Sequence, residues 1–100
     1  MAKKAIYVHL EAKPGKEAEV EKFLTGAVPL VEAEPLTVTW YAIKEGPGMY
    51  GIFDTFDAEA GRDAHLNGKV AAALMAKAKE LFKNEIQINK CDVLADKLPK

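Results

Sequence analysis

The sequence predicts one α+β domain of the ferredoxin-like kind, in which helices cover one face of a four-stranded antiparallel sheet. Three observations support this prediction. Apolar side chains alternate along residues 4–12, they recur at helical spacing from residue 16 onward, and two β-rich segments within residues 36–56 are separated by Glu45-Gly46-Pro47-Gly48. The chain has 100 residues, of which 49% are hydrophobic, so residues 1–100 suffice for a single folded domain.

The first expected strand, residues 4–12, places Ile6 and Leu10 on one side and Tyr7 and His9 on the other. This alternation has the period of two residues that is typical of a strand. Lys13-Pro14-Gly15 then breaks the pattern.

A long amphipathic helix is expected from residue 16 to Glu34-Pro35, with Val20 and Leu24 on its apolar side. Pro29 falls on the outer side of this helix, where it would remove one backbone hydrogen bond and bend the helix without entering the core.

Residues 36–44 and 49–56 are predicted to pair as a β-hairpin. Alternation divides the second strand into two rows, and both are apolar enough to face the helices. One row is Tyr50, Ile52, Asp54 and Phe56, and the other is Met49, Gly51, Phe53 and Thr55.

After this hairpin, Asp57 is a candidate N-cap for a short helix that ends near residues 66–68. A third helix is expected over residues 69–82, a last strand over 85–95 and a tail over 96–100. The expected order is thus β-α-β-β-α-α-β, a split βαβ arrangement.

The composition argues against several classes of function. Lys and Arg number 14 against 15 Asp and Glu, and neither charge forms a block, so no nucleic-acid partner is expected. No segment is apolar and long enough to span a membrane, and no leader-like cleavage site follows the N-terminus. The single cysteine, Cys91, fits a reducing cytoplasm, and a small residue on a strand is its favoured interpretation.

One face of the predicted sheet is left without helices. Tyr7 and one row from each hairpin strand would lie there, so this face should be aromatic and partly apolar. A monomer of this size rarely exposes such a patch to water, and a twofold pair is the default assembly. The sequence therefore predicts a homodimer.

Short segments in a particular order also connect this chain to a known family, and together they cover nearly its whole length. They are Ala12-Lys13-Pro14-Gly15-Lys16, Glu34-Pro35, Asp54-Thr55-Phe56, Ala64-His65-Leu66 and residues 92–99. In these segments the chain resembles the antibiotic biosynthesis monooxygenase family of the dimeric α+β barrel superfamily. Phe56 stands where members commonly have Trp, and the first strand contains no Asn, so the heme-degrading branch of the superfamily is disfavoured.

The resemblance implies oxidation of a small, electron-rich, quinol-like aromatic substrate by dioxygen, without a metal or organic cofactor. Such an enzyme binds an apolar ring, removes a proton, stabilises the resulting anion and excludes water. His65 is the candidate base or anion stabiliser because an imidazole is partly neutral near pH 7, and Asp54 is the second candidate catalytic residue. Aromatic residues that could bind the substrate are Phe56, Tyr50, Trp40, Tyr41 and Phe53.

Simpler roles remain open for the same side chains. His65 could only fill space beside Gly61 and Ala64, and Asp54 is a better candidate for holding local structure, or for orienting the imidazole, than for proton transfer. His9 is favoured as a solvated or interface residue. No close pair of metal ligands such as His-x-His is present, so no metal is expected.

The charged residues Glu17, Lys22, Arg62 and Lys79 are interpreted as solvated. Two alternatives to an oxygenase also stand, because a fold does not determine a reaction. One is a non-redox, isomerase-type enzyme on the same scaffold. The other is a dimer that binds a small ligand without chemistry.

Overall fold

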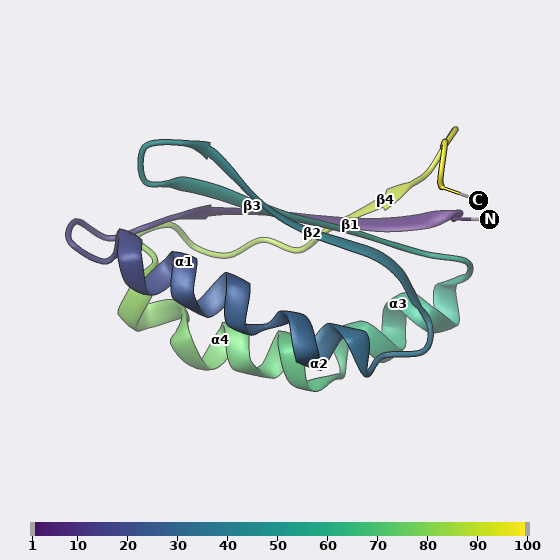
Figure 1. Cartoon of the computed structure of the whole chain (residues 1–100), viewed down its shortest axis with the longest axis horizontal. Helices are drawn as coiled ribbons and strands as arrows, with labels where there is room; N and C mark the ends of the chain where they lie inside the picture. The colour runs from purple at the N-terminus through teal and green to yellow at the C-terminus, as the bar shows by residue number, and fades with distance from the viewer. Residues whose placement is uncertain (1, 100) are drawn as a thin grey trace.

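The computed structural model describes residues 2–99 and contains four strands and four helices. All the helices lie on one side of the sheet (Figure 1). Residues 1 and 100 lie outside the described part, so the predicted tail is followed only over 96–99, where it has no helix or strand. The elements are β1 (Lys4–Glu11), α1 (Glu17–Gly26), α2 (Val28–Glu32), β2 (Thr37–Gly46), β3 (Met49–Phe56), α3 (Glu59–Leu66), α4 (Lys69–Leu81) and β4 (Asn89–Asp92).

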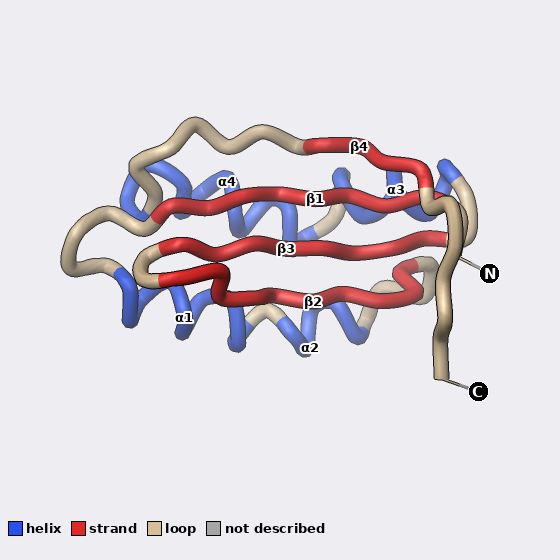
Figure 2. Tube along the Cα trace, turned by 90° about the horizontal axis from the view of Figure 1, so that it is seen from above, coloured by secondary structure: helices blue, strands red, loops and turns tan. Residues whose placement is uncertain are grey.

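The strands form one sheet in the order β2-β3-β1-β4, and every neighbouring pair is antiparallel. Figure 2 shows this sheet from its uncovered face, with α1 and α2 behind the β2 side and α3 and α4 behind the β4 side. The predicted ferredoxin-like α+β fold, with helices on one face of a four-stranded antiparallel sheet, is therefore confirmed for the single chain.

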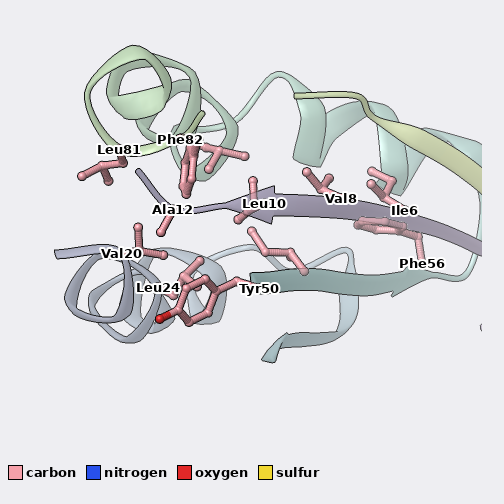
Figure 3. Close-up of a cluster of buried hydrophobic side chains, with 12 residues drawn as sticks. Ile6, Val8, Leu10, Ala12, Val20, Leu24, Tyr50, Phe56, Leu81 and Phe82 are labelled. Carbon is pink, nitrogen blue, oxygen red and sulfur yellow. The ribbon is translucent and has the colours of Figure 1, made fainter. Parts of the chain in front are cut away.

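The hydrophobic core lies between the sheet and the helices (Figure 3). β1 contributes alternate residues such as Ile6 and Leu10, as its pattern predicts, and the helices contribute Val20 and Leu24. The structure also decides which row of β3 faces the helices. It is the row of Tyr50, Ile52, Asp54 and Phe56, all of which are buried.

The predicted long helix is two helices, with the break at Ala27 between α1 and α2. Pro29 is exposed and occupies the first turn of α2, where its missing N–H breaks no helical hydrogen bond. The expectation that Pro29 stays on the outside is correct. The expected bend is instead a complete break, because a new helix starts at Val28 and has Pro29 in its first turn.

Two further boundaries differ from the prediction. The N-cap of α3 is Ala58, with no side-chain cap, and not Asp57. β4 is shorter than residues 85–95 because Asn84 occupies part of the β1 edge. Its side chain accepts a hydrogen bond from the backbone N–H of Glu11 and donates one to the carbonyl of His9, which replaces strand pairing there.

Candidate functional site

A buried aspartate and a buried histidine meet between β3 and α3. Asp54 lies on the helix-facing row of β3, and His65 lies in the last turn of α3. Nε2 of His65 is 2.9 Å from Oδ2 of Asp54, and the side chains of His65 and Asp54 are only 7% and 2% exposed. The structure thus brings together the two residues predicted to be catalytic.

The second ring nitrogen of His65 contacts a residue that the sequence did not single out for chemistry. Nδ1 of His65 is 2.6 Å from Oε1 of Glu34, which lies in the connection between α2 and β2. The same oxygen accepts a hydrogen bond of 2.7 Å from the hydroxyl of Thr37. Glu34 is separated from His65 by 31 residues, so only the return of the chain to the sheet after α2 could have indicated this contact.

These contacts determine the charge on His65. Burial alone would lower the pKa of His65, but the hydrogen bonds and charges of Asp54 and Glu34 outweigh it and raise that pKa above its usual value. An ionised carboxylate only accepts hydrogen bonds, so both ring nitrogens are placed to donate, which is the geometry of an imidazolium. Glu34, His65 and Asp54 therefore form one hydrogen-bonded chain, which we call the carboxylate–imidazolium chain.

Close packing of α3 on the α2–β2 connection holds the carboxylate–imidazolium chain in place. A Cβ atom on Gly61 would lie 3.0 Å from the carbonyl oxygen of Leu36, so glycine allows the two segments to approach. Phe56 is fully buried, and its ring centroid is 5.4 Å from that of His65 at an angle of 45°. In Figure 1, α3 and the α2–β2 connection lie at the same end of the molecule.

Two cavities adjoin the carboxylate–imidazolium chain. One of about 390 Å³ lies between the α2–β2 connection and α3, and His65 is part of its lining. The second, of about 250 Å³, is bordered by α2 and β2 and is lined in part by Trp40. Glu34 and Thr37 line both cavities, so the chain lies beside a space of small-ligand size.

A larger cavity of about 490 Å³ lies between α1 and α4. Its lining contains neither Asp54 nor His65, and no other histidine. The candidate functional site is therefore beside the two smaller cavities, which Glu34 borders.

The five aromatic residues predicted to bind substrate do not share one cavity. Phe56 and Trp40 lie on the helix side of the sheet near Asp54, and Trp40 is the cross-strand partner of Asp54. Tyr50 is at the other end of β3, where its hydroxyl donates a 2.5 Å hydrogen bond to Glu21. The remaining two, Tyr41 and Phe53, lie on the uncovered face, so they do not share a cavity with His65 of the same protomer.

His9 also lies on the uncovered face, as β1 alternation predicts. Its Nδ1 is 2.7 Å from Glu45, its Nε2 is 3.1 Å from Glu11, and the Tyr7 hydroxyl donates to Glu45 as well. Burial works to lower the pKa of His9, but the two glutamates raise it overall. This polar cluster is on the opposite side of the sheet from Asp54.

Arg62 corrects one expectation, because it is buried rather than solvated. Its Nη1 donates to the carbonyl oxygens of Ala5 in β1 and Cys91 in β4, at 3.3 and 3.1 Å. Its Nη2 forms a 2.8 Å ion pair with Glu59. Arg62 therefore links α3 to the pair β1–β4, a structural role that helical periodicity alone does not reveal.

Within residues 2–99, no group of three or more His, Cys, Asp or Glu side chains is arranged to hold a metal ion. In the same part of the chain, no helix combines the length and apolar character needed to cross a membrane.

The fold and this site define a ferredoxin-like α+β protein with a buried carboxylate–imidazolium chain. Its structure is similar to the crystal structure of NE2512 from Nitrosomonas europaea, a protein of unknown function, with 53% sequence identity and a TM-score of 0.96. The match covers 100% of this chain and 97% of that one. The chain therefore belongs to the same protein family as NE2512.

More distant structures support the fold assignment. A protein described as an antibiotic biosynthesis monooxygenase is 15% identical, with a TM-score of 0.78 over 92% of this chain and 99% of that one. A Caulobacter crescentus protein, provisionally given the same name, is 18% identical, with a TM-score of 0.78 over 94% of this chain and 92% of that one. The predicted resemblance to this family is thus confirmed at the level of the fold.

Searches of protein-family models and of curated proteins produce no match to this chain.

Proposed function

We propose that this protein is a cofactor-independent monooxygenase that acts on a small, electron-rich, quinol-like aromatic compound. The observation that carries the proposal is the carboxylate–imidazolium chain, which leads from a carboxylate that is 2% exposed to a cavity of about 390 Å³. The monooxygenase name of proteins with the same fold supports the choice of dioxygen as the second substrate.

The carboxylate–imidazolium chain is suited to moving a proton. Asp54 is nearly inaccessible, whereas the side chain of Glu34 is 18% exposed and borders both cavities. When Asp54 takes up a proton, His65 can release the proton on Nδ1 to Glu34 and from there to solvent, while its Nε2–H continues to donate to Oδ2 of Asp54. His65 thus acts as a relay that gives up one proton when Asp54 gains one, rather than as a free base.

The oxidation itself would be supplied by the substrate. Loss of a proton gives an electron-rich anion, which reduces dioxygen at an activated ring carbon. In a quinol, one ring C–H becomes C–OH, the two original hydroxyl groups lose their hydrogen atoms and become carbonyls, and the other oxygen atom leaves as water, so four electrons pass from substrate to dioxygen. The protein has to bind the ring, take the proton and exclude water, and the two cavities that Glu34 borders offer apolar side chains for the ring.

We also propose that the active form is a homodimer joined through the uncovered face of the sheet. Tyr41, Ile43 and Phe53 are 56%, 44% and 38% exposed there, although they lie on strands. Burying such a face against a second copy removes an apolar patch from water. Light scattering coupled to size exclusion should give twice the mass of 10.9 kDa, and a single monomeric peak at micromolar concentration would contradict the dimer.

Oxygen uptake tests the reaction. With a panel of small quinols in chelator-treated buffer, the protein should consume oxygen faster than the quinols oxidise alone. Asp54→Asn and His65→Gln should each abolish most of this excess, because each interrupts the carboxylate–imidazolium chain. Glu85→Gln, a change at an exposed position, is the matched control and should retain full activity.

Two results would count against this function. Absence of excess oxygen uptake with every quinol would argue against an oxygenase. Undiminished oxygen uptake by a folded Asp54→Asn variant would show that Asp54 does not take up the proton. Product formation without oxygen would instead identify an isomerase-type enzyme, which needs only the proton transfer.

A further inference from the structure

Two buried polar atoms near the Asp54–His65 contact have no hydrogen-bond partner among residues 2–99. They are Oδ1 of Asp54 and Nε1 of Trp40. Buried polar groups are nearly always paired, so two unpaired ones on neighbouring residues need an explanation. We infer that they form the two halves of a binding site for one hydroxyl group of the substrate, an inference that rests on the proposed function.

The placement of the two residues supports a shared ligand. Trp40 and Asp54 are direct partners in the ladder between β2 and β3, and both side chains are on the helix side of the sheet. Directly opposed residues have Cβ atoms about 4.5–5.5 Å apart, so the two side chains lie next to each other. His65 holds Oδ2 of Asp54, which fixes the carboxylate while Oδ1 stays free.

The chemistry of the two atoms selects the ligand group. A carboxylate oxygen only accepts a hydrogen bond, and an indole N–H only donates one. A hydroxyl group does both, so it satisfies Asp54 and Trp40 together. A ketone or ether oxygen would accept from Trp40 but leave Oδ1 of Asp54 unpaired, and a hydrocarbon would leave both atoms unpaired.

Space for the rest of the ligand exists beside Trp40. Trp40 lines the cavity of about 250 Å³ together with Glu34 and Thr37, which also line the cavity beside His65. Asp54 does not line this cavity, so the hydroxyl group of a ring beside the indole has to enter between Trp40 and Asp54 to reach Oδ1.

This binding mode also assigns the first step of the reaction. The O–H bond of the bound hydroxyl breaks, its proton moves to Oδ1 of Asp54, and the electron pair stays on the ligand oxygen. The indole N–H of Trp40 continues to donate to that oxygen and stabilises the new negative charge. Asp54 is thus the catalytic base, and Trp40 is a specificity-determining contact.

The test compares 2-naphthol, 2-methoxynaphthalene and 2-methylnaphthalene in oxygen-free buffer. The chain has a single tryptophan, so its indole N–H gives one NMR signal without ambiguity. We expect 2-naphthol to shift this signal and to bind about tenfold or more tightly than the other two compounds, because only the hydroxyl pairs both buried atoms.

Trp40→Phe keeps an aromatic ring but removes the N–H. By calorimetry it should weaken 2-naphthol binding about 3- to 10-fold and change the binding of 2-methylnaphthalene less than about twofold. If this variant does not fold, the wild-type signal and the three affinities decide alone.

Equal affinities for the three compounds, binding of none of them, or an unmoved indole signal would overturn the inference, since the two atoms would then hold only a buried water. Hydroxyl preference without oxygen uptake would support the binding site while the oxygenase proposal fails. Oxygen uptake without hydroxyl preference would support the oxygenase proposal while the proposed hydroxyl-binding site fails.

Discussion

Replacing Glu34 by glutamine should destabilise the protein without disturbing its geometry. The amide oxygen of glutamine can still accept from His65 and from Thr37, which donate to Glu34 at 2.6 and 2.7 Å. A hydrogen bond to a charged group contributes about 1.5–3 kcal/mol and a neutral one about 0.5–1.5 kcal/mol, so the expected loss in the free energy of unfolding is about 1–1.5 kcal/mol. For a chain of this size that corresponds to a fall in Tm of about 4–12 °C.

The pH dependence of this loss follows from the raised pKa of His65. The unfolded value is near 6.5, so the stabilisation from charged His65 is fully present below that pH and is lost as pH rises through the higher folded pKa. Glu34→Gln removes one of the two causes of the raised pKa and therefore lowers it. The difference in stability between wild type and variant should be largest near pH 6 and should narrow toward pH 9.

Urea denaturation at several pH values, followed by circular dichroism, measures both effects. Glu32→Gln is the matched control, because Glu32 is exposed at the end of α2, and its effect should stay within about 0.5 kcal/mol. A Glu34→Gln variant as stable as wild type at pH 6, or a loss that does not change with pH, would refute the charged contact with His65.

Three further predictions concern other parts of the structure. Phe56→Trp should lower stability by about 1–3 kcal/mol, because Phe56 is fully buried and an indole would overpack its site; a chemical denaturation midpoint equal to wild type would contradict this. Tyr50, whose pKa is raised to about 12 by burial and by its contact with Glu21, should give phenolate absorbance only near that pH, and Tyr50→Phe should remove this step. Arg62→Met should lower the free energy of unfolding by about 2–4 kcal/mol and speed amide exchange in β4, since it leaves two backbone carbonyls and Glu59 without their donor. Unchanged amide exchange in β4 would be inconsistent with these contacts.

The fold could be predicted from the sequence because its patterns are local and strong. The alternation along β1 and the helical spacing of Val70 and Leu74 in α4 each identify an element and its buried side. The length of β4 could not be predicted, since the side chain of Asn84 replaces strand pairing through contacts with β1, more than 70 residues away in sequence.

The site was only half predictable for the same reason. Asp54 and His65 are 11 residues apart, and the short turn from strand to helix makes their meeting foreseeable. Trp40 was a candidate and its strand was expected to pair with residues 49–56, but the register that places it opposite Asp54 has no local sequence pattern. Glu34 joins through the packing of the α2–β2 connection, which has no local pattern either. Arg62 was wrongly expected to be solvated, because its position in the sequence lies on the polar side of α3. Its long side chain nevertheless reaches backbone carbonyls in β1 and β4.

The protonation state of His65 tests most directly whether Glu34, His65 and Asp54 form one charged hydrogen-bonded chain. The protein has two histidines, so ¹⁵N-labelled imidazole NMR can resolve His65 and assign it with a His9→Gln variant. The structure predicts that both ring nitrogens of His65 carry a proton at pH 7, each donated to a carboxylate. A neutral ring with a proton on only one nitrogen at that pH would contradict the carboxylate–imidazolium chain and the relay proposed from it.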